Sequence, residues 1–506
     1  MIYTIMKNTA RLILAAIAVA AALVSCTKDL NPGKADTGSE AGTLRTITVS
    51  FNTPTKAYLD GLKPHFSKGD SILVEGSILS GGEKQTVYDT CIVSVKNGIA
   101  TISTELTGLL NAYYPLASTK IEPDCLTQFV PPMQTGRFDD VNICSAEIPK
   151  GGTMAKFENE FPILRFYAGA GIGVDTIRIK SSEGIAGVQV TDTVITVAAP
   201  EVDTTKGAEV VEAAEAVALV EEQEPVQDPR IWYVAVRGNV NANDLTFESV
   251  TNTQGTVEKT PTTDLHLVKG KIYNAFIPYY ITVAGDKWAY CNVGAFLPEE
   301  PGEYFMWGEV QGHKAVGTGE GAFDFTGFAP FESDTERYIK ASPNLGFHQD
   351  NAPYYDPGQS KFTKYNGSDG KTKLELCDDA ANANWGGNWR MPTYDEINNL
   401  YDEAGWALDE EFYDYTADAF FIPIAGYGSG NGLYAFKEDL RYWSSTLYGD
   451  DKTKGYYLYF NSGDCMKVDG SARYYGYPVR PIYDETLSGD QPTTVTIQAY
   501  TDGQTL

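Results

Sequence analysis

The sequence predicts a mainly β N-terminal half followed by an α+β C-terminal half. In the first half, short segments alternate apolar with polar residues, and clusters of Gly, Pro and Asn separate them. Helix-period patterning is scarce there, which favours a β-sandwich. From about Asp286 the chain becomes rich in Trp, Tyr, Gly and Asn, and a capped-helix signature follows Pro392.

The first 25 residues have the pattern of a secretory signal. Lys7 and Arg11 precede the apolar run Leu12–Leu23, which is too short to span a bilayer comfortably. The run ends in Leu-Val-Ser-Cys at 23–26, which resembles the lipobox of bacterial lipoproteins. That resemblance implies removal of residues 1–25, lipidation of Cys26 and a place in the cell outer membrane, exposed at the surface. An ordinary signal peptide with an incidental Cys26 is the alternative.

Composition restricts the classes of partner and cofactor. The chain has 506 residues, enough for two or three cored domains, and its formal net charge of −28 argues against nucleic acid as a partner. Apart from Cys26, six cysteines remain, and none forms a CxxC pair. Neither a zinc ribbon nor a redox motif is therefore indicated, and we expect no metal and no cofactor.

The strands of the first half follow a small polar tether at residues 26–45. Ile47, Val49 and Phe51 alternate with polar residues, as a half-buried strand requires. Strands are predicted at 46–51, 71–75, 164–167, 176–180, 188–197, 231–236 and 271–277. The Ala/Glu/Val-rich stretch 198–226 interrupts them and is read as either a short helix or an acidic loop.

Six motifs in the first half occur in the order seen in Bacteroidetes fimbrillin-like proteins, which this half resembles. They are TPTKAYLDGLKPHFSKGDSILV, NAYYPLAS, FVPPMQ, FENEFPILRF, WYVAVRG and LVKGKIYNAFIP. The resemblance covers residues 46–281 and implies two transthyretin-like β-sandwich subdomains, lipoprotein export and fimbrial subunits as partners in a pilus. In that family a protease cuts after an arginine in the first strand region, and another subunit's strand fills the groove by β-augmentation. Arg45 matches that arginine; a merely solvated arginine is the alternative.

A second set of motifs covers residues 284–483. WAYCNVGA, GEYFMWGE, LCDDAANANWGGNWRMPT, FIPIAGYGSG, YWSSTLYG and YPVRPI appear in sequence. Together they closely resemble the Fibrobacter succinogenes major paralogous domain, a C-type-lectin-like module. The resemblance implies a binding face for a glycan or a host protein.

The stretch NWGGNWRMPTYDE at 384–396 is explained by folding signals. Asp378 is predicted to cap a short helix that Gly386-Gly387 ends, and Thr393 with Glu396 fits a capping box for a second helix. Ile397, Leu400, Tyr401 and Ala404 then follow at helical spacing. An acid pair or calcium site built from Asp378, Asp379, Asp395 and Glu396 is the competing reading, but capping accounts for these carboxylates more simply.

No catalytic or metal constellation can be assembled from the sequence. Gly426–Gly430 lacks the nucleophile-elbow register, and the four histidines are scattered without an H-E-x-x-H spacing. Calcium-dependent lectins of the resembled superfamily carry Glu-Pro-Asn or Gln-Pro-Asp triplets, which this module lacks. We therefore expect no enzyme activity and no metal.

Aromatic residues near predicted loops supply the candidate ligand face. This cluster of aromatic residues includes Tyr442, Trp443, Tyr448, Tyr474, Tyr475 and Tyr477. Trp443 is expected to lie in the core. Aromatic rings stack on the apolar faces of sugar rings. Tyr448, Tyr474 and Tyr475 are the candidate ligand-binding residues.

The tail at 484–506 contains one more strand signal. Val495, Ile497 and Ala499 alternate with polar residues after a polar linker at 485–492. A lone strand must pair with a sheet to be stable. Either Val495–Tyr500 is an assembly strand donated to a neighbouring subunit, or it folds back onto its own module or frays.

The favoured function is a cell-surface lipoprotein that acts as an adhesin or as a pilus-associated fimbrial subunit. It would contact the membrane through its lipid and a glycan or host protein through the lectin-like module. Two alternatives remain: an outer-membrane accessory that captures glycans for uptake, and an enzyme of the formylglycine-generating type, which shares a related lectin-like fold.

Overall fold

The computed structural model describes part of the chain, and all structural statements concern that part. The described residues are 44–51, 66–80, 83–121, 126–169, 172–187, 192–198, 228, 230–251, 254–261, 264–326, 336–339, 345–403, 407–409, 414–417, 420–461, 467–487 and 496–499. The predicted signal, Cys26 and most of the 198–226 stretch lie outside it. Arg45–Leu506 forms one compact unit.

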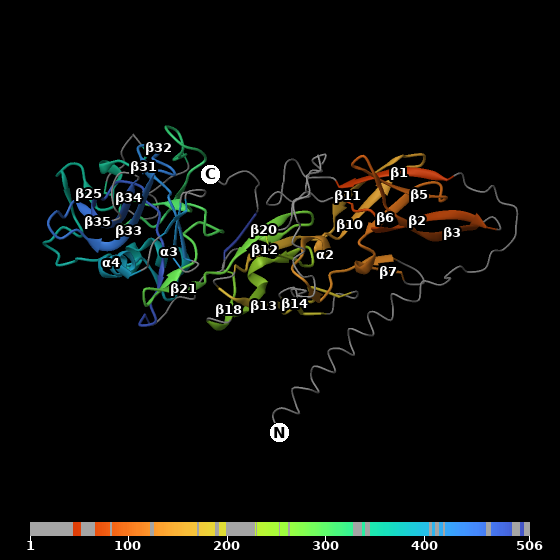
Figure 1. Cartoon of the computed structure of the whole chain (residues 1–506), viewed down its shortest axis with the longest axis horizontal. Helices are drawn as coiled ribbons and strands as arrows, with labels where there is room; N and C mark the ends of the chain where they lie inside the picture. Colours follow the sequence, from red (N-terminus) through yellow and green to blue (C-terminus); the bar gives the residue numbers. More distant parts are fainter. Residues whose placement is uncertain are drawn as a thin grey trace, which may run out of the picture. The chain divides into compact units, whose positions relative to one another are not determined.

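The first sheet has eight strands in the order β3-β2-β6-β10-β11-β1-β5-β4 (Figure 1). The strands are β1 Arg45–Phe51, β2 Ser71–Ser80, β3 Glu83–Ile92, β4 Ser94–Lys96, β5 Ile99–Thr104, β6 Leu110–Tyr114, β10 Cys144–Ile148 and β11 Met154–Asn159. β1 lies parallel to β11 and antiparallel to β5. Ile72 of β2 shares one buried core with Phe157 of β11 and Ile47 of β1, which lie several strands away in this order. The sheet therefore folds over on itself as a β-sandwich.

The second sandwich packs a four-stranded sheet on a five-stranded one. The first has the order β15-β12-β20-β37, and the second β18-β17-β13-β14-β9. The strands are β9 Met133–Gln134, β12 Ile163–Tyr167, β13 Val174–Ser181, β14 Val194–Ala198, β15 Ile231–Ala235, β17 Leu245–Thr251, β18 Gly255–Lys259, β20 Ile272–Phe276 and β37 Thr496–Ala499. All residues of β12 and β15 are buried, and the rings of Phe166 and Phe247 meet across the layers at 5.5 Å.

The C-terminal region, residues 280–487, combines small sheets with two helices. A four-stranded sheet has the order β21-β22-β36-β27, and a three-stranded one β33-β34-β35. Their bounds are β21 Tyr280–Val283, β22 Asp286–Ala289, β27 Trp389–Arg390, β36 Ile482–Tyr483, β33 Asp439–Leu447, β34 Lys454–Asn461 and β35 Lys467–Ala472, with helices α3 Ala380–Trp385 and α4 Tyr394–Glu403. Trp288 of β22 pairs with Ile482 of β36, so strands from the start and the end of the region are hydrogen-bonded to each other.

Shorter elements complete the described fold. They are β7 Thr119–Ile121, β8 Leu126–Gln128, α2 Phe138–Val141, β16 Val240–Asn241, β19 His266–Leu267, β23 Glu303–Tyr304, β24 His313–Lys314, β25 Tyr355–Asp356, β26 Lys361–Phe362, β28 Ala407–Asp409, β29 Asp414–Ala417, β30 Phe420–Pro423, β31 Tyr427–Ser429 and β32 Gly432–Tyr434, besides short 3-10 turns.

One hydrophobic core runs from the second sandwich into the C-terminal region. The rings of Tyr167 and Tyr290 stack at 4.7 Å, and those of Phe276 and Trp385 lie 5.1 Å apart. At the edge of this contact Arg230 pairs with Glu299 at 2.7 Å. Because the two parts share buried surface, separating them would expose apolar side chains to water.

The predicted fold class is confirmed. The first half is built of β-sheets, and the C-terminal region mixes sheets with helices. The predicted strands appear as β1, β2, β12, β13, β14, β15 and β20, although β14 begins only at Val194. Among the described residues, none of the helices has the length and apolar character needed to cross a membrane.

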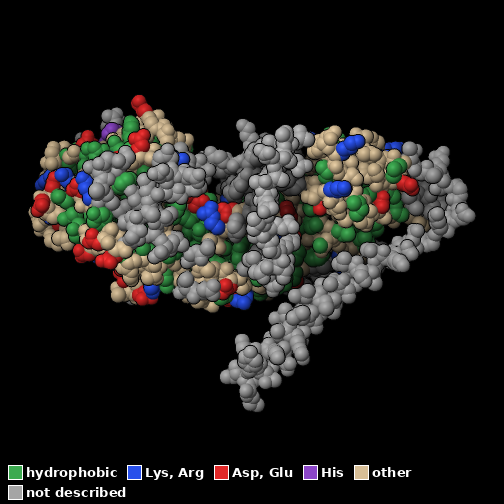
Figure 2. Space-filling model, in the orientation of Figure 1, with side chains coloured by type: hydrophobic (Ala, Val, Ile, Leu, Met, Phe, Trp, Pro, Cys, Tyr) green, Lys and Arg blue, Asp and Glu red, His purple; other side chains and the backbone are tan. Residues whose placement is uncertain are grey.

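Surface charge is mixed over the described elements. On the face shown in Figure 2, Lys and Arg side chains are interspersed with Asp and Glu and do not gather into one continuous patch. The formal net charge of −28 counts the whole chain and not this face alone.

Candidate functional site

The two tryptophans of the NWGGNW stretch lie in the core. Asp379 caps α3 by accepting a hydrogen bond from Asn382 N at 3.0 Å, and Gly386 ends the helix with φ of 64°. Trp385 and Trp389 are 3% and 1% exposed, and their rings meet at 5.2 Å and 90°. The predicted helix and its glycine stop are confirmed, but the cap is Asp379, so the assignment of the cap to Asp378 was wrong.

The predicted capping box of α4 is confirmed. Thr393 N donates to Glu396 Oε2 at 2.8 Å, and Glu396 N donates back to Thr393 Oγ1 at 3.3 Å. Arg390 also forms ion pairs with Glu396 at 2.6 Å and with Asp484 at 2.7 Å. Burial opposes ionisation of Asp484, yet hydrogen bonds from Thr486 and Arg390 hold its pKa at about 2. Glu396 and Asp484 are therefore each held by Arg390 and stabilise the fold.

Asp378 is the centre of a buried ion-pair network. Its side chain is fully buried and accepts from Arg337 Nη2 at 2.9 Å and Lys364 Nζ at 2.6 Å. The hydroxyls of Tyr354 and Tyr365 each donate to it at 2.6 Å. The donors come from segments up to 41 residues away in sequence, which explains why Asp378 does not cap the adjacent helix. Together with Arg337 Nε at 3.2 Å, these four side chains satisfy both carboxylate oxygens.

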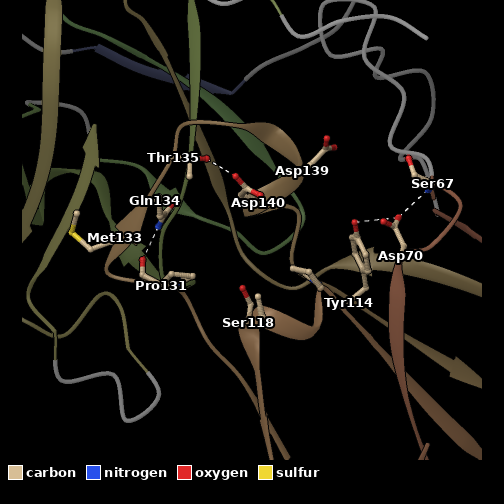
Figure 3. Close-up of a pocket in the computed structure, with 12 residues that line it drawn as sticks. Ser67, Asp70, Tyr114, Ser118, Pro131, Met133, Gln134, Thr135, Asp139 and Asp140 are labelled. Atoms are coloured by element: carbon tan, nitrogen blue, oxygen red, sulfur yellow. Dashed lines mark hydrogen bonds between the residues drawn. The ribbon is translucent and has the colours of Figure 1, made fainter. Parts of the chain in front are cut away.

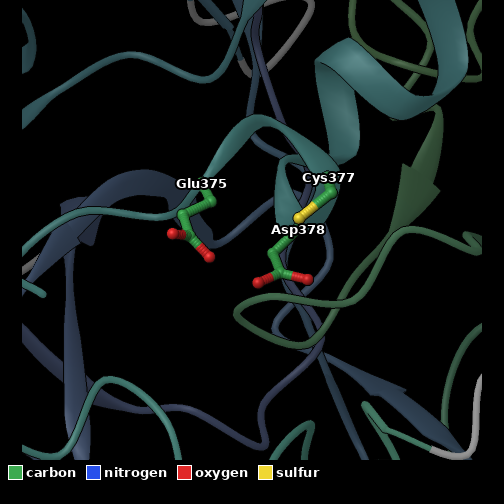
Figure 4. A group of neighbouring side chains, drawn as sticks. All are labelled: Glu375, Cys377 and Asp378. Carbon is green, nitrogen blue, oxygen red and sulfur yellow. The ribbon is translucent and has the colours of Figure 1, made fainter. Parts of the chain in front are cut away.

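Asp378 lies with Glu375 and Cys377 on one turn, where three atoms able to bind a metal come within 4.8 Å of one another (Figure 4). Glu375 forms ion pairs with Lys364 at 2.7 Å and with Lys371. Burial raises the pKa of the Cys377 thiol, which disfavours the thiolate that binds metals. A metal ion would have to displace existing cationic partners, so this group acts as a structural cluster.

The candidate ligand residues divide between two faces of the β33-β34-β35 sheet. Tyr448 is half-buried and packs on Tyr456, at 4.8 Å, which in turn meets Tyr394 of α4 at 4.4 Å. Tyr456 and Tyr457 are successive residues of β34 and therefore point to opposite faces. Tyr457 is in contact with Tyr477, at 5.3 Å, on the side where Tyr475 lies. Tyr448 therefore does not share a site with Tyr475.

Tyr474 and Tyr475 belong to the second face and lie together. Their rings are 4.6 Å apart, and Tyr475 meets Tyr427 edge-on at 5.8 Å. The guanidinium of Arg441 lies 3.8 Å from the centre of the Tyr427 ring and pairs with Asp439 at 2.6 Å. The hydrogen bond with Tyr475, followed by burial, raises the pKa of Tyr474 to about 12.

We call Tyr427, Arg441, Tyr474 and Tyr475 the tyrosine face; all four side chains are partly exposed. Sequence reasoning missed Tyr427 and Arg441. The signal was present for Arg441, which alternates with buried Tyr442 along β33. By contrast, Tyr442, Trp443 and Tyr477 are at most 2% exposed, and the prediction that Trp443 is in the core is confirmed.

Arg45 is the first residue of β1. It pairs with Thr104, and its side chain donates to the backbone oxygen of Gly152 at 2.5 Å. A cut after Arg45 would leave Thr46–Phe51 paired between β11 and β5. Such a cut would release the tether without opening a groove in this sheet. Cleavage at Arg45 stays a prediction.

The tail strand β37 lies against the second sandwich. Its residues pair with β20 in antiparallel register, with Ile497 opposite Ala275. Ile497 is 1% exposed and belongs to the core shared by the sandwich and the C-terminal region. Thus 496–499 forms a strand as predicted, but it returns to the sandwich rather than folding onto its own module. β37 therefore pairs with the edge of β20 within the same chain.

A separate pocket of about 550 Å³ lies beside β6 and β9 (Figure 3). Asp70, Asp139 and Asp140 contribute carboxylates to its wall, and Tyr114 donates to Asp70 at 3.5 Å. Acidic walls favour a cation over an anion. No sequence pattern indicates this pocket, because its residues come from four separate segments.

The solved structures that resemble this chain do so at low sequence identity. No family model matches the chain, and no curated protein matches it. A proposed cell adhesion protein from Bacteroides uniformis ATCC 8492 aligns over 47% of this chain and 93% of its own, with 10% identity and a TM-score of 0.29. Another from Bacteroides ovatus ATCC 8483 aligns over 47% and 92%, with 11% identity and a TM-score of 0.30. At these values neither likeness carries an argument about function.

Proposed function

We propose that the chain is a cell-surface lipoprotein that acts as an adhesin or pilus-associated subunit, and that its C-terminal region binds a glycan or a host protein. The observation that carries this proposal is the tyrosine face. It combines three partly exposed rings with one guanidinium. Rings of this kind stack on the apolar faces of sugars, and polar neighbours orient the hydroxyls.

Packing beneath the tyrosine face favours binding. Tyr475 and Tyr427 pack on the core that runs into the second sandwich. Side chains already held by packing lose little rotamer entropy when a ligand binds, which lowers the cost of association. The lipobox at Cys26 and the resemblance of 46–281 to fimbrillin-like proteins support a position at the outer-membrane surface.

The mature chain, residues 26–506, should be screened on glycan and host-protein arrays. The whole chain is needed because an isolated 284–483 module would expose the shared core. The double variant Tyr474→Ala/Tyr475→Ala should weaken the ligand at least about tenfold, which corresponds to roughly 1.4 kcal/mol. Tyr448→Ala, on the other sheet face, is the matched control and should bind as the parent does. Equal loss in both variants, or unchanged affinity in the double variant, would refute the assignment.

A second function, subunit assembly, is favoured by the edge position of β37. An edge strand held by four register pairs is a candidate for exchange with the same strand of a second copy. In that case β37 would leave β20 and pair with β20 of a neighbouring subunit.

Cysteine variants distinguish exchange from self-pairing. Ala275→Cys and Ile497→Cys place thiols at directly opposed positions. The double variant should form a disulfide within one chain if β37 stays on its own β20. Cells making the two single variants together should form a disulfide between chains only if β37 is exchanged. Disulfides confined to single chains would rule out assembly by this strand.

The alternatives call for other observations. An accessory for glycan uptake predicts a glycan transporter among neighbouring genes, whereas a pilus role predicts fimbrial subunits. The formylglycine-generating type needs an active cysteine pair. Burial raises the pKa of the fully buried Cys291 thiol, which disfavours it as a nucleophile.

A further inference from the structure

A small cavity lies in the core beneath α4. Its volume is about 10 Å³, close to the space that one water molecule requires. The wall is mainly apolar and is formed by Trp288, Pro392, Ile397, Leu400, Ile422, Tyr442, Trp443, Leu458 and Arg480. These residues come from β22, α4, β30, β33, β34 and the segments that precede α4 and β36. The cavity therefore lies where the start and the end of the C-terminal region meet.

Two side chains of this wall carry a donor without an acceptor. Among the described residues, Trp288 Nε1 and Arg480 Nη2 have no hydrogen-bond partner, and both side chains are 1% exposed. Arg480 uses its other donors, since Nε donates to Asn292 Oδ1 at 2.7 Å and Nη1 donates to Ala289 O at 3.1 Å. Both acceptors are neutral amide oxygens. A buried donor left without an acceptor is costly, as is a buried cation without compensation.

The wall also offers one acceptor. The hydroxyl of Tyr442 donates to Pro423 O at 2.8 Å and accepts from Asn292 Nδ2 at 3.0 Å. A hydroxyl oxygen has two lone pairs, and a hydrogen bond from Arg480 to this hydroxyl opposes the rise that burial causes in the pKa of Tyr442. The two donors without an acceptor, Trp288 Nε1 and Arg480 Nη2, match a water molecule that accepts twice. A chloride ion would also accept twice and would compensate the guanidinium charge.

We propose that this cavity binds a single solvent-derived hydrogen-bond acceptor, water or chloride, between Trp288 Nε1 and Arg480 Nη2. The bound species links β22 at the start of the region to Arg480 near its end, under the apolar face of α4. Its chemistry is that of a compact acceptor, because a cavity of about 10 Å³ leaves room for a single small species.

Crystals of the mature chain grown with sodium bromide in place of sodium chloride identify the species. An anomalous peak within hydrogen-bond distance of both nitrogens assigns a halide. Spherical density at the same place without an anomalous signal assigns water. A cavity that is empty in well-ordered density, or donors bonded to protein oxygens instead, overturns the proposal.

A solution measurement tests the same idea independently. Trp288→Phe removes the donor while keeping an aromatic ring, and Trp443→Phe is its matched control, because Trp443 Nε1 donates to Phe305 O at 2.8 Å. If the cavity is occupied, both variants should lower the melting temperature by roughly 1–3 °C. If Trp288→Phe leaves the melting temperature unchanged or raises it, its donor had no partner to lose and the proposal fails.

Discussion

Ile497→Ala is the sharpest test of how the tail strand is held. Ile497 is 1% exposed, lies opposite Ala275 and belongs to the core cluster that the second sandwich shares with the C-terminal region. Gln498, the next residue, is exposed. Comparing variants at these two positions therefore separates the effect of core packing from the effect of strand pairing within one strand.

The expected magnitude follows from burial. Replacing a fully buried isoleucine by alanine costs about 2–5 kcal/mol. We expect the low end, about 2 kcal/mol, because an edge strand can detach and limit the loss. That energy corresponds to roughly 30-fold faster exchange of the amides that the pairing protects. Gln498→Ala should change stability by no more than about 0.5 kcal/mol.

Hydrogen exchange followed by mass spectrometry measures this effect. Peptides that contain β37 or β20 should lose protection in Ile497→Ala, whereas peptides from β33 and β34 should keep theirs. If Ile497→Ala and Gln498→Ala exchange alike, or if protection in β20 is unchanged, then β37 is not docked through Ile497.

Two further changes have defined outcomes. Burial raises the pKa of Asp379 to about 6, so the folded chain binds this proton more tightly than the unfolded chain does. The contribution of Asp379 to the free energy of unfolding should therefore rise as the pH falls from about 7 to about 4, and Asp379→Asn should remove that contribution in denaturant titrations; identical pH slopes in parent and variant would contradict the burial argument. Cys26→Ala should release the chain from outer-membrane fractions, and full retention in those fractions would argue against a lipid anchor.

Local hydrogen bonding explains what the sequence predicted well. The capping box joins Thr393 to Glu396 within four residues, and the glycine stop follows α3 directly. Strands such as β1 could be predicted because apolar and polar residues alternate at consecutive positions. Such signals need no knowledge of distant partners.

Long-range pairing explains what the sequence could not predict. Asp378 and Asp379 are neighbours with the same side chain, and only Arg337 and Lys364 make one of them an ion-pair centre. Tyr448 was grouped with Tyr475 because both lie near loops, whereas strand register separates them. β37 pairs with β20 across more than 200 residues of sequence, and no local sequence pattern indicates that β20 is its partner.

Adherence of whole cells tests the proposed function most directly. Cells of a non-adherent strain that display the lipidated chain should bind a surface coated with the ligand found on the arrays. Soluble mature chain should compete for that surface, whereas the Tyr474→Ala/Tyr475→Ala variant should not. If displaying cells bind no better than cells without the chain, or if the variant competes as well as the parent, then the chain is not an adhesin that acts through its tyrosine face.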